Sequence, residues 1–413
     1  MDQNSQWNIS RLRLCRRLSV LFCAAALSAC SGSGGTGPNP VPEPLPVPVP
    51  PVEPILNATG PGEWRQTSLL RSIPVGEIAA VLQAAGARAP QLTPRYEVRA
   101  YRLEYLSRDG QGREVLASGL VAVPSKPAGA PSPVLSYQHA TLMHENEAPS
   151  HQAVASEAVV MMASAGYIVV AADYIGYGLS KQLPHPYLQA APSASAVNDL
   201  LTAARYWRYS AGIADNRQLF MGGYSQGGYV TMAAHRALQN SQSPLRLQLL
   251  ASAPGAGAYS VSATLDELLR QVKEKNPLLG TLLNPGLLRY LSDSVRQRVR
   301  DELLKLVVDA DSDIRFAPRF IDLYLADDIA SLKAESDVHD WAPQKPVYLF
   351  HGREDRTVPY LNASLALDSM ARQGAGRQVS LNACPSQPSG HIDCVLPYWN
   401  FMLQQFAGLA RDL

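Results

Sequence analysis

The clearest sign of chemistry in this sequence is a serine flanked by glycines, Gly223-Tyr224-Ser225-Gln226-Gly227. An apolar, strand-like stretch precedes it, and a helix-like stretch follows it. A tight turn between strand and helix needs small residues two before and two after the serine, which Gly223 and Gly227 provide. The helix would direct its free N–H groups at the place where negative charge develops. The segment therefore predicts a nucleophilic serine, Ser225.

The alternative is a glycine-rich turn in a nucleotide-binding sheet. Such a turn requires the pattern G-x-G-x-x-G or a Lys-Ser/Thr pair, and neither occurs at this turn. The nucleophile interpretation is preferred for that reason.

A serine hydroxyl is a weak nucleophile at neutral pH, so a histidine must take its proton and an acid must orient the histidine. Of eight histidines, His391 alone follows the last predicted core strand in a loop of small residues. It could also be a surface histidine, and His351 is its rival. Two adjacent carboxylates, Glu354 and Asp355, follow a buried strand and are the candidate acids.

The chain order Ser, Asp, His resembles the α/β-hydrolase superfamily over about residues 131–413. Beside the serine motif, the resemblance is carried by Gly390-His391 and by the run His351-Gly352-Arg353-Glu354-Asp355-Arg356-Thr357-Val358-Pro359. Within the superfamily, Tyr137-Gln138-His139-Ala140-Thr141 and a helical insertion resemble the secreted bacterial lipase and esterase branch. The resemblance implies a mostly parallel central sheet flanked by helices, and a triad of Ser225, Asp355 and His391.

The same resemblance makes His351 a structural histidine, and its His-Gly-x-x-Asp spacing favours Asp355 over Glu354 as the acid. It also implies an oxyanion hole with two donors. One is the N–H of Gln226, and the other comes from the loop at His139 or Ala140. Relatives usually carry His-Gly-Thr in that loop, so the Cβ of Ala140 leaves open which N–H points inward.

Alternating strands and helices must position these residues, and they indicate an α/β fold. Strands are expected near residues 96–106, 114–123, 133–141, 167–173, 219–222, 247–253, 347–351 and 379–381, the first two forming an antiparallel hairpin. Helices are expected near 152–165, 194–209, 229–235 and 397–410. Asp173, Gly176 and Gly178 would shape a turn beside the active site, with Tyr174 and Tyr177 at the rim of the pocket.

A helical insertion of about residues 257–343 separates two core strands. Leu265, Leu268, Leu269 and Val272 share one helical face, a leucine-rich stretch covers 278–291, and Val295, Val299, Leu303 and Val307 continue a stripe. These leucines could simply form a small core of their own. The position of the insertion, on the carboxyl side of the sheet, also fits a cap whose leucines line an acyl pocket.

The first 55 residues have a different character. A basic region and a short apolar stretch end in Leu27-Ser28-Ala29-Cys30, which resembles a bacterial lipobox. The resemblance implies that residues 1–29 are a lipoprotein signal peptide, that Cys30 is acylated, and that the protein is anchored to the outer membrane. An ordinary secretory signal is the alternative. Residues 30–55 are a proline-rich linker, which leaves 56–413 as the hydrolase domain.

The five cysteines fit an oxidising compartment. Cys15 and Cys23 would leave with the signal, and Cys30 would carry lipid. Cys384 and Cys394 bracket His391 and could form a disulfide or remain free thiols. No His or Cys spacing matches a zinc site, so no metal and no cofactor are expected.

Composition narrows the partners. The chain of 413 residues has 36 Lys and Arg against 35 Asp and Glu, so no nucleic-acid partner is implied. The sequence predicts a lipid-anchored serine hydrolase that cleaves small-molecule carboxylic esters or lipids. The alternatives are a peptidase or acyltransferase on the same fold, and a non-catalytic surface binding protein.

Overall fold

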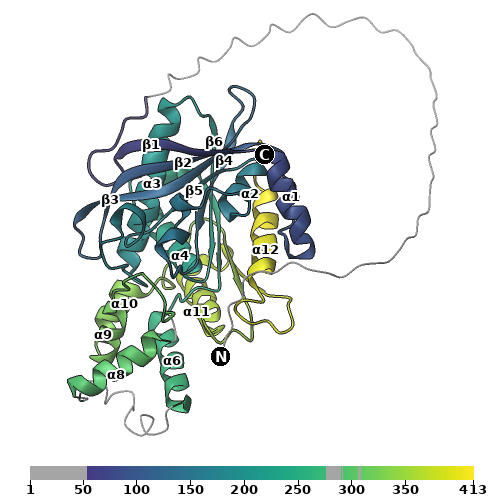
Figure 1. Cartoon of the computed structure of the whole chain (residues 1–413). Coiled ribbons are helices and arrows are strands. Elements are labelled where there is room, and N and C mark those ends of the chain that lie inside the picture. Colours follow the sequence, from purple (N-terminus) through teal and green to yellow (C-terminus); the bar gives the residue numbers. More distant parts are fainter. Residues whose placement is uncertain (1–53, 276–289, 291, 306–307) are drawn as a thin grey trace, which may run out of the picture. The chain divides into compact units, whose positions relative to one another are not determined.

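The computed structural model describes residues 54–275, 290, 292–305 and 308–413 (Figure 1). The chain divides into two compact units, Met1–Pro54 and Ile55–Leu413. The predicted signal peptide, Cys30 and all but the end of the predicted linker lie outside the described residues.

A nine-stranded sheet in the order β1-β2-β3-β5-β4-β6-β7-β8-β9 forms the centre of the described chain. Its strands are β1 (Trp64–Ile73), β2 (Val98–Arg108), β3 (Glu114–Pro124), β4 (Ser132–Gln138), β5 (Ile168–Ala172), β6 (Asp215–Tyr224), β7 (Leu249–Gly255), β8 (Val347–His351) and β9 (Val379–Ala383).

The six strands from β4 to β9 run parallel, whereas β1, β2 and β3 pair antiparallel with their neighbours. The hairpin of β2 and β3 runs in continuous register from Arg108 opposite Glu114 to Val98 opposite Pro124. The predicted hairpin and the predicted mostly parallel sheet are both confirmed.

Helices of the described chain lie beside the sheet, apart from those between β7 and β8, which extend away from it (Figure 1). The helices are α1 (Val75–Ala85), α2 (Ala158–Ser164), α3 (Ala190–Ser210), α4 (Gln226–Gln239), α5 (Leu245–Gln248), α6 (Val261–Lys275), α8 (Asp293–Leu304), α9 (Arg319–Leu325), α10 (Ile329–Ser336), α11 (Leu361–Met370) and α12 (Val395–Ala407). Short helical turns are η1 (Gly86–Arg88), η2 (Glu145–Glu147), η3 (Pro149–His151), η4 (Gly178–Ser180) and η6 (Ala371–Ala375).

Strand β5 shows why the sheet is buried on both faces. Ile168, Val170 and Ala172 belong to one buried apolar cluster, whereas Val169 and Ala171 belong to another. Successive side chains of a strand point to opposite faces, so each face of the sheet meets its own layer of helices. This continuous apolar run is what made the strand recognisable in the sequence.

Four elements illustrate where the structure differs from the expectation. The helix expected at 152–165 begins only at Ala158, because residues before it form turns. Neither β1 with α1 nor α11 was predicted. Most residues of β1 are exposed or half-buried, so this edge strand lacks the apolar alternation that marks a strand in sequence.

The predicted helical insertion lies between β7 and β8 and contributes α6, α8, α9 and α10 (Figure 1). Leu265, Leu268 and Leu269 of α6 are buried, as are Val299 and Leu303 of α8. The side chains of Val272 and Val307 and nearly all of the stretch 278–291 lie outside the described residues. We call the segment from α6 to α10 the cap.

In the part of the chain that is described, no helix combines the length and the hydropathy needed to cross a bilayer.

Candidate active site

The turn after β6 holds Ser225 in a backbone conformation that residues other than glycine rarely adopt, with φ 58°. A Cβ on Gly223 would lie 2.4 Å from the carbonyl oxygen of Gln138, and one on Gly227 would lie 2.1 Å from the same oxygen. The end of β4 therefore runs so close to this turn that only glycine fits at both positions. The close approach fixes the serine at the carboxyl edge of the sheet.

Three residues from separate loops meet at that edge. The Nε2 atom of His391 lies 2.8 Å from Oγ of Ser225, and Nδ1 of His391 lies 2.6 Å from Oδ2 of Asp355. Both distances are within hydrogen-bond range. The structure thus joins the three predicted residues in one chain of hydrogen bonds, in the arrangement of a nucleophile, a base and an orienting acid.

Asp355 is buried and held on both carboxylate oxygens. Its Oδ1 accepts hydrogen bonds from the N–H groups of Thr357 and Val358, each at 2.9 Å. Burial would raise its pKa, but hydrogen bonds from His351 and His391 outweigh burial and lower the pKa to about 2. The carboxylate is therefore ionised at neutral pH and can only accept, which places the proton of His391 on Nδ1.

His351, the rival base, lies behind the acid. It is fully buried, with Nε2 2.9 Å from the carbonyl oxygen of Val358 and 3.4 Å from Oδ2 of Asp355. This location gives His351 a structural part in holding the acid loop.

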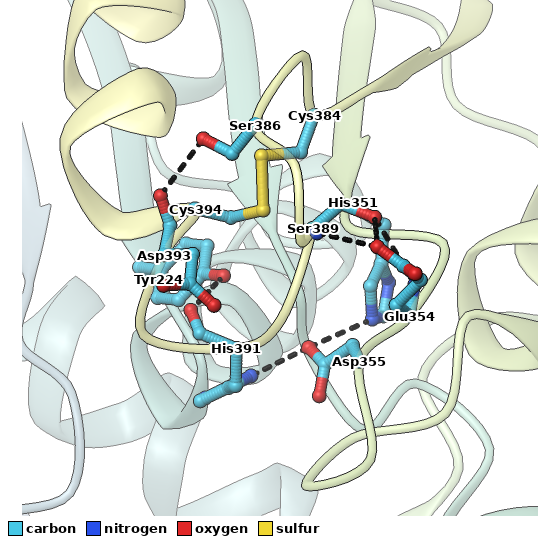
Figure 2. Close-up of a disulfide and its surroundings, with 10 residues drawn as sticks. All are labelled: Tyr224, His351, Glu354, Asp355, Cys384, Ser386, Ser389, His391, Asp393 and Cys394. Atoms are coloured by element: carbon cyan, nitrogen blue, oxygen red, sulfur yellow. Dashed lines mark hydrogen bonds and ion pairs between the residues drawn. A yellow bond between two sulfur atoms is a disulfide. The ribbon is translucent and has the colours of Figure 1, made fainter.

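Glu354, the rival acid, points away from His391 (Figure 2). Its Oε2 accepts hydrogen bonds from N–H of Ser389 at 2.7 Å and from Oγ of Ser389 at 3.2 Å. Glu354 therefore ties the acid loop to the loop that carries His391.

A disulfide joins Cys384 and Cys394 around the loop that carries His391 (Figure 2). Inside this loop, the hydroxyl of Tyr224 donates to the carbonyl oxygen of His391 at 2.7 Å. The base is thus anchored by a covalent bond and by hydrogen bonds from two other segments.

The three candidate oxyanion residues are placed differently. Gln226 is the first residue of α4, so its N–H has no acceptor inside the helix. Ala140 lines the cavity at Ser225. The side chain of His139 is buried and stacks on Tyr174 with ring centroids 3.9 Å apart. Gln226 as one donor, and His139 or Ala140 as the source of the other, stay predictions.

A cavity of about 370 Å³ opens beside Ser225 and His391. Its apolar lining includes Leu265 and Leu268 of the cap together with Phe320 of α9. Two leucines of the predicted cap thus line a cavity at Ser225, and its use as an acyl pocket stays a prediction. Loop residues Met143, Tyr187, Leu188, Val358 and Ile392 and the first residue of α12, Val395, add to the apolar lining.

The expectation that Tyr174 and Tyr177 rim the pocket is wrong. Both are buried, and their hydroxyls donate to the carbonyl oxygens of His139 and Leu142. They support the oxyanion loop from behind. Asp173 has the architectural part expected of it, accepting from Oγ of Ser118 at 2.6 Å and from N–H of Ser150 at 2.8 Å.

Two residues near the site were not predicted. Tyr187 lines the cavity, and its hydroxyl lies 3.2 Å from Oγ1 of Thr141. His185 lies 2.6 Å from the side-chain nitrogen of Gln226. Both belong to a loop whose sequence, Pro184-His185-Pro186-Tyr187, resembles no motif, so only the fold could reveal them.

Within the described residues, no group of three or more His, Cys, Asp or Glu side chains is arranged to hold a metal ion.

Comparison with known proteins places this chain in a family. The family described as serine aminopeptidase, S33, matches residues 148–383. No curated protein matches the sequence. Among solved structures, a putative hydrolase from Legionella pneumophila is similar, with a TM-score of 0.66 and 22% identity over 84% of this chain and 97% of that chain.

Two further structures share the fold. A ligand-bound form of the rice cell wall degrading esterase LipA from Xanthomonas oryzae has a TM-score of 0.64 and 24% identity, covering 86% of this chain and 100% of that chain. The closed state of Candida antarctica lipase A has a TM-score of 0.55 and 18% identity, covering 86% of this chain and 84% of that chain. At these identities, the likeness establishes the fold.

Proposed function

This chain belongs to the serine aminopeptidase S33 family of α/β hydrolases, and from that premise we propose that it is a serine hydrolase of carboxylic esters. The observation that carries the proposal is the hydrogen-bonded chain from Asp355 through His391 to Ser225, which ends at an apolar cavity. An apolar wall suits the acyl chain of an ester, and the histidine and oxyanion donors serve its carbonyl.

In the proposed mechanism, Oγ of Ser225 attacks the ester carbonyl carbon while Nε2 of His391 takes the serine proton. The N–H groups of Gln226 and Ala140 donate to the carbonyl oxygen as it gains negative charge. The carbon–oxygen bond to the alcohol then breaks, and His391 returns the proton to the departing alcohol. Asp355 stabilises the positively charged imidazole throughout.

An acyl-enzyme remains on Ser225. His391 next takes a proton from a water molecule, whose oxygen attacks the acyl carbon. The tetrahedral intermediate collapses, the acid leaves, and the serine hydroxyl regains its proton. Ser225, His391, the departing alcohol and the water account for every proton transfer in the two steps, and the amides contribute hydrogen bonds only.

The first test is hydrolysis of p-nitrophenyl esters with acyl chains from C2 to C16, by the wild-type protein and by Ser225→Ala. We expect activity with the wild type, a preference for short to medium chains because the cavity is small, and loss of turnover in the variant. Substituting the nucleophile in such sites typically costs a factor on the order of 10⁶ in kcat. Equal ester hydrolysis by both proteins would disprove the proposal.

The name of the matching family favours a second candidate, an aminopeptidase. The same triad can attack an amide, in which case His391 protonates a leaving amine. Amino-acid p-nitroanilides, proline among them, distinguish the two. Hydrolysis of anilides with a kcat/KM above that of every ester would replace the esterase proposal.

We also propose that the protein is a lipoprotein of the cell envelope, attached through Cys30 to the outer membrane. Support for this comes from the basic and apolar N-terminal segment and the Leu27-Ser28-Ala29-Cys30 motif. Stable anchoring takes more than one acyl chain, which a lipidated N-terminal cysteine supplies.

A further inference from the structure

A buried histidine that the mechanism above does not use lies against the residue after the nucleophile. His185 is 2% exposed and Gln226 is 3% exposed. The Nε2 atom of the histidine lies 2.6 Å from Nε2 of the glutamine. The side chain of the residue whose backbone N–H serves as an oxyanion donor is therefore held by a second polar group.

The hydrogen bond at the other ring nitrogen determines which of the two atoms, Nε2 of His185 or Nε2 of Gln226, is the donor in this contact. Nδ1 of His185 lies 2.7 Å from the carbonyl oxygen of Ile175, which can only accept, so Nδ1 carries the proton. Burial lowers the pKa of His185 to about 4, so the ring is neutral at neutral pH. Its Nε2 then has only a lone pair and accepts an N–H from Gln226. The bond to Ile175 thus fixes the tautomer of the ring, and the contact with Gln226 fixes the orientation of the amide.

The backbone of the same histidine is bonded to the cap. The N–H of His185 donates to the carbonyl oxygen of Arg315 at 2.7 Å, and N–H of Ala317 donates to the carbonyl oxygen of His185 at 2.8 Å. The ring also meets the ring of Phe316 edge-on, with centroids 5.6 Å apart. Residues 315–317 thus pair with His185 as a short parallel bridge.

The opposite side of His185 is packed tightly. A Cβ on Gly176 would lie 2.7 Å from Cα of His185. The histidine is therefore clamped between the turn after β5 and the cap, and its imidazole is fixed relative to the elbow.

We propose that His185 is a positioning residue that couples the cap to the oxyanion hole. The cap segment 315–317 holds the histidine, the histidine holds the side chain of Gln226, and this orients the N–H of Gln226 toward the oxyanion. The inference rests on the proposed function, since it assigns a task within the same site.

Hydrogen bonds weaken steeply as their angle departs from linearity, so a small rotation of the Gln226 peptide weakens the donor. The carbonyl oxygen is uncharged in the bound ester and gains its negative charge through the transition state to the tetrahedral intermediate. Loss of the contact should therefore lower kcat and leave KM nearly unchanged.

Two substitutions of His185 distinguish the contribution of Nδ1 from that of Nε2. Asn at position 185 offers a polar atom at the place of Nδ1 and none at the place of Nε2. His185→Asn therefore keeps the hydrogen bond to the carbonyl oxygen of Ile175 and loses the hydrogen bond from Gln226. His185→Gln places an oxygen near the position of Nε2 and can still accept from Gln226. In the full chain, we expect H185N to lower kcat about tenfold, less than the 10²–10³ of a fully deleted donor. We expect H185Q to recover most of that loss.

A matched control is available in His235, another fully buried histidine on the adjacent helix α4. Its Nδ1 lies 2.9 Å from Oγ of Ser252, away from Gln226. His235→Asn makes the same chemical change in the same core, and we expect it to leave kcat unchanged. Thermal unfolding of all variants measures any common loss of stability.

The readouts are kcat, KM and the rate of labelling by a fluorophosphonate, which forms an Oγ–P bond on Ser225 as fluoride leaves. Labelling uses the oxyanion hole without requiring an ester substrate. If the wild type labels but hydrolyses no ester, the proposed function fails, and the labelling rates of the variants still test His185.

The inference is wrong if H185N matches the wild type in kcat and labelling, if it changes only KM, or if H185Q is as slow as H185N. It is also wrong if H235N slows both reactions equally. Should H185N fail to fold, Gln226→Met tests the same contact from the other side. We expect Q226M to lower kcat about as much as H185N, and Q226M combined with H185Q to be no slower than Q226M alone.

Discussion

At the scale of single residues, the adjacent carboxylates of Asp355 and Glu354 have different partners and therefore different roles. Asp355 accepts from His391, whereas Glu354 accepts from Ser389. One orients the base directly, and the other anchors the loop on which the base sits. Their different partners make the choice of acid testable.

We predict that Asp355→Asn lowers kcat by a factor on the order of 10⁴, because an amide in place of the carboxylate no longer holds the productive tautomer of His391. Glu354→Gln keeps an oxygen that can accept from Ser389, so its kcat should fall far less. Steady-state kinetics of both variants with one p-nitrophenyl ester provide the comparison. A larger loss in E354Q than in D355N would reverse the assignment of the acid.

The sequence could identify Ser225, Asp355 and His391 because each stands in a short motif beside a recognisable strand. It could not separate His139 from Ala140 as the second donor, since the difference is one of direction within a single loop. The sequence also predicted that Tyr174 and Tyr177 lie at the pocket rim. In the structure both are buried behind the oxyanion loop. The direction in which a side chain or N–H group of an irregular loop points depends on packing against distant parts of the chain, which a local sequence pattern does not predict.

At the scale of elements, the elbow depends on the close approach of β4. We predict that Gly227→Ala sharply reduces folded, active protein, because its Cβ would lie 2.1 Å from a backbone oxygen that cannot rotate away. A methyl group added to Gly76 of α1 would meet no heavy atom within 4 Å, which makes Gly76→Ala the control.

The control substitution should stabilise the protein slightly, by up to about 1 kcal/mol, since Ala favours helix over Gly. Circular dichroism melting curves and fluorophosphonate labelling of the two variants give the result. A G227A protein with wild-type melting temperature and labelling would contradict the packing argument.

The disulfide around His391 leads to a prediction for its whole loop. Replacing both Cys384 and Cys394 by Ser should lower the free energy of unfolding by roughly 3 kcal/mol, the cost expected for opening a loop of about ten residues. It should also lower kcat, because His391 lies inside that loop. Urea unfolding and ester hydrolysis of the double variant measure both effects. Unchanged kcat would show that hydrogen bonds alone hold the base.

Elements with strong apolar patterns were predictable, as β5 and the strand of the elbow show. Strand β1 was not, because an edge strand in contact with solvent on much of its surface carries no such pattern. The start of α2 was placed too early because turns before Ala158 contain residues that also suit a helix.

At the scale of the whole molecule, the predicted tether concerns residues outside the described fold. We predict that Cys30→Ser abolishes incorporation of radiolabelled palmitate and releases the protein from membranes into the soluble fraction. Because the triad belongs entirely to the second compact unit, ester hydrolysis by the released protein should be unchanged. Cys15→Ser, within the predicted signal, is the control and should still be labelled. Continued labelling of C30S would refute the lipobox interpretation.

The order of the triad along the chain has a consequence for the timing of biogenesis. His391 follows β9, so the base joins the serine only after every strand of the described sheet has been synthesised. Domains assemble as synthesis proceeds, but a ribosome-bound chain with β6 complete has an elbow and no base. A chain still on the ribosome therefore lacks the base that the proposed mechanism requires, and it becomes competent for hydrolysis only after the residues beyond β9 have been synthesised.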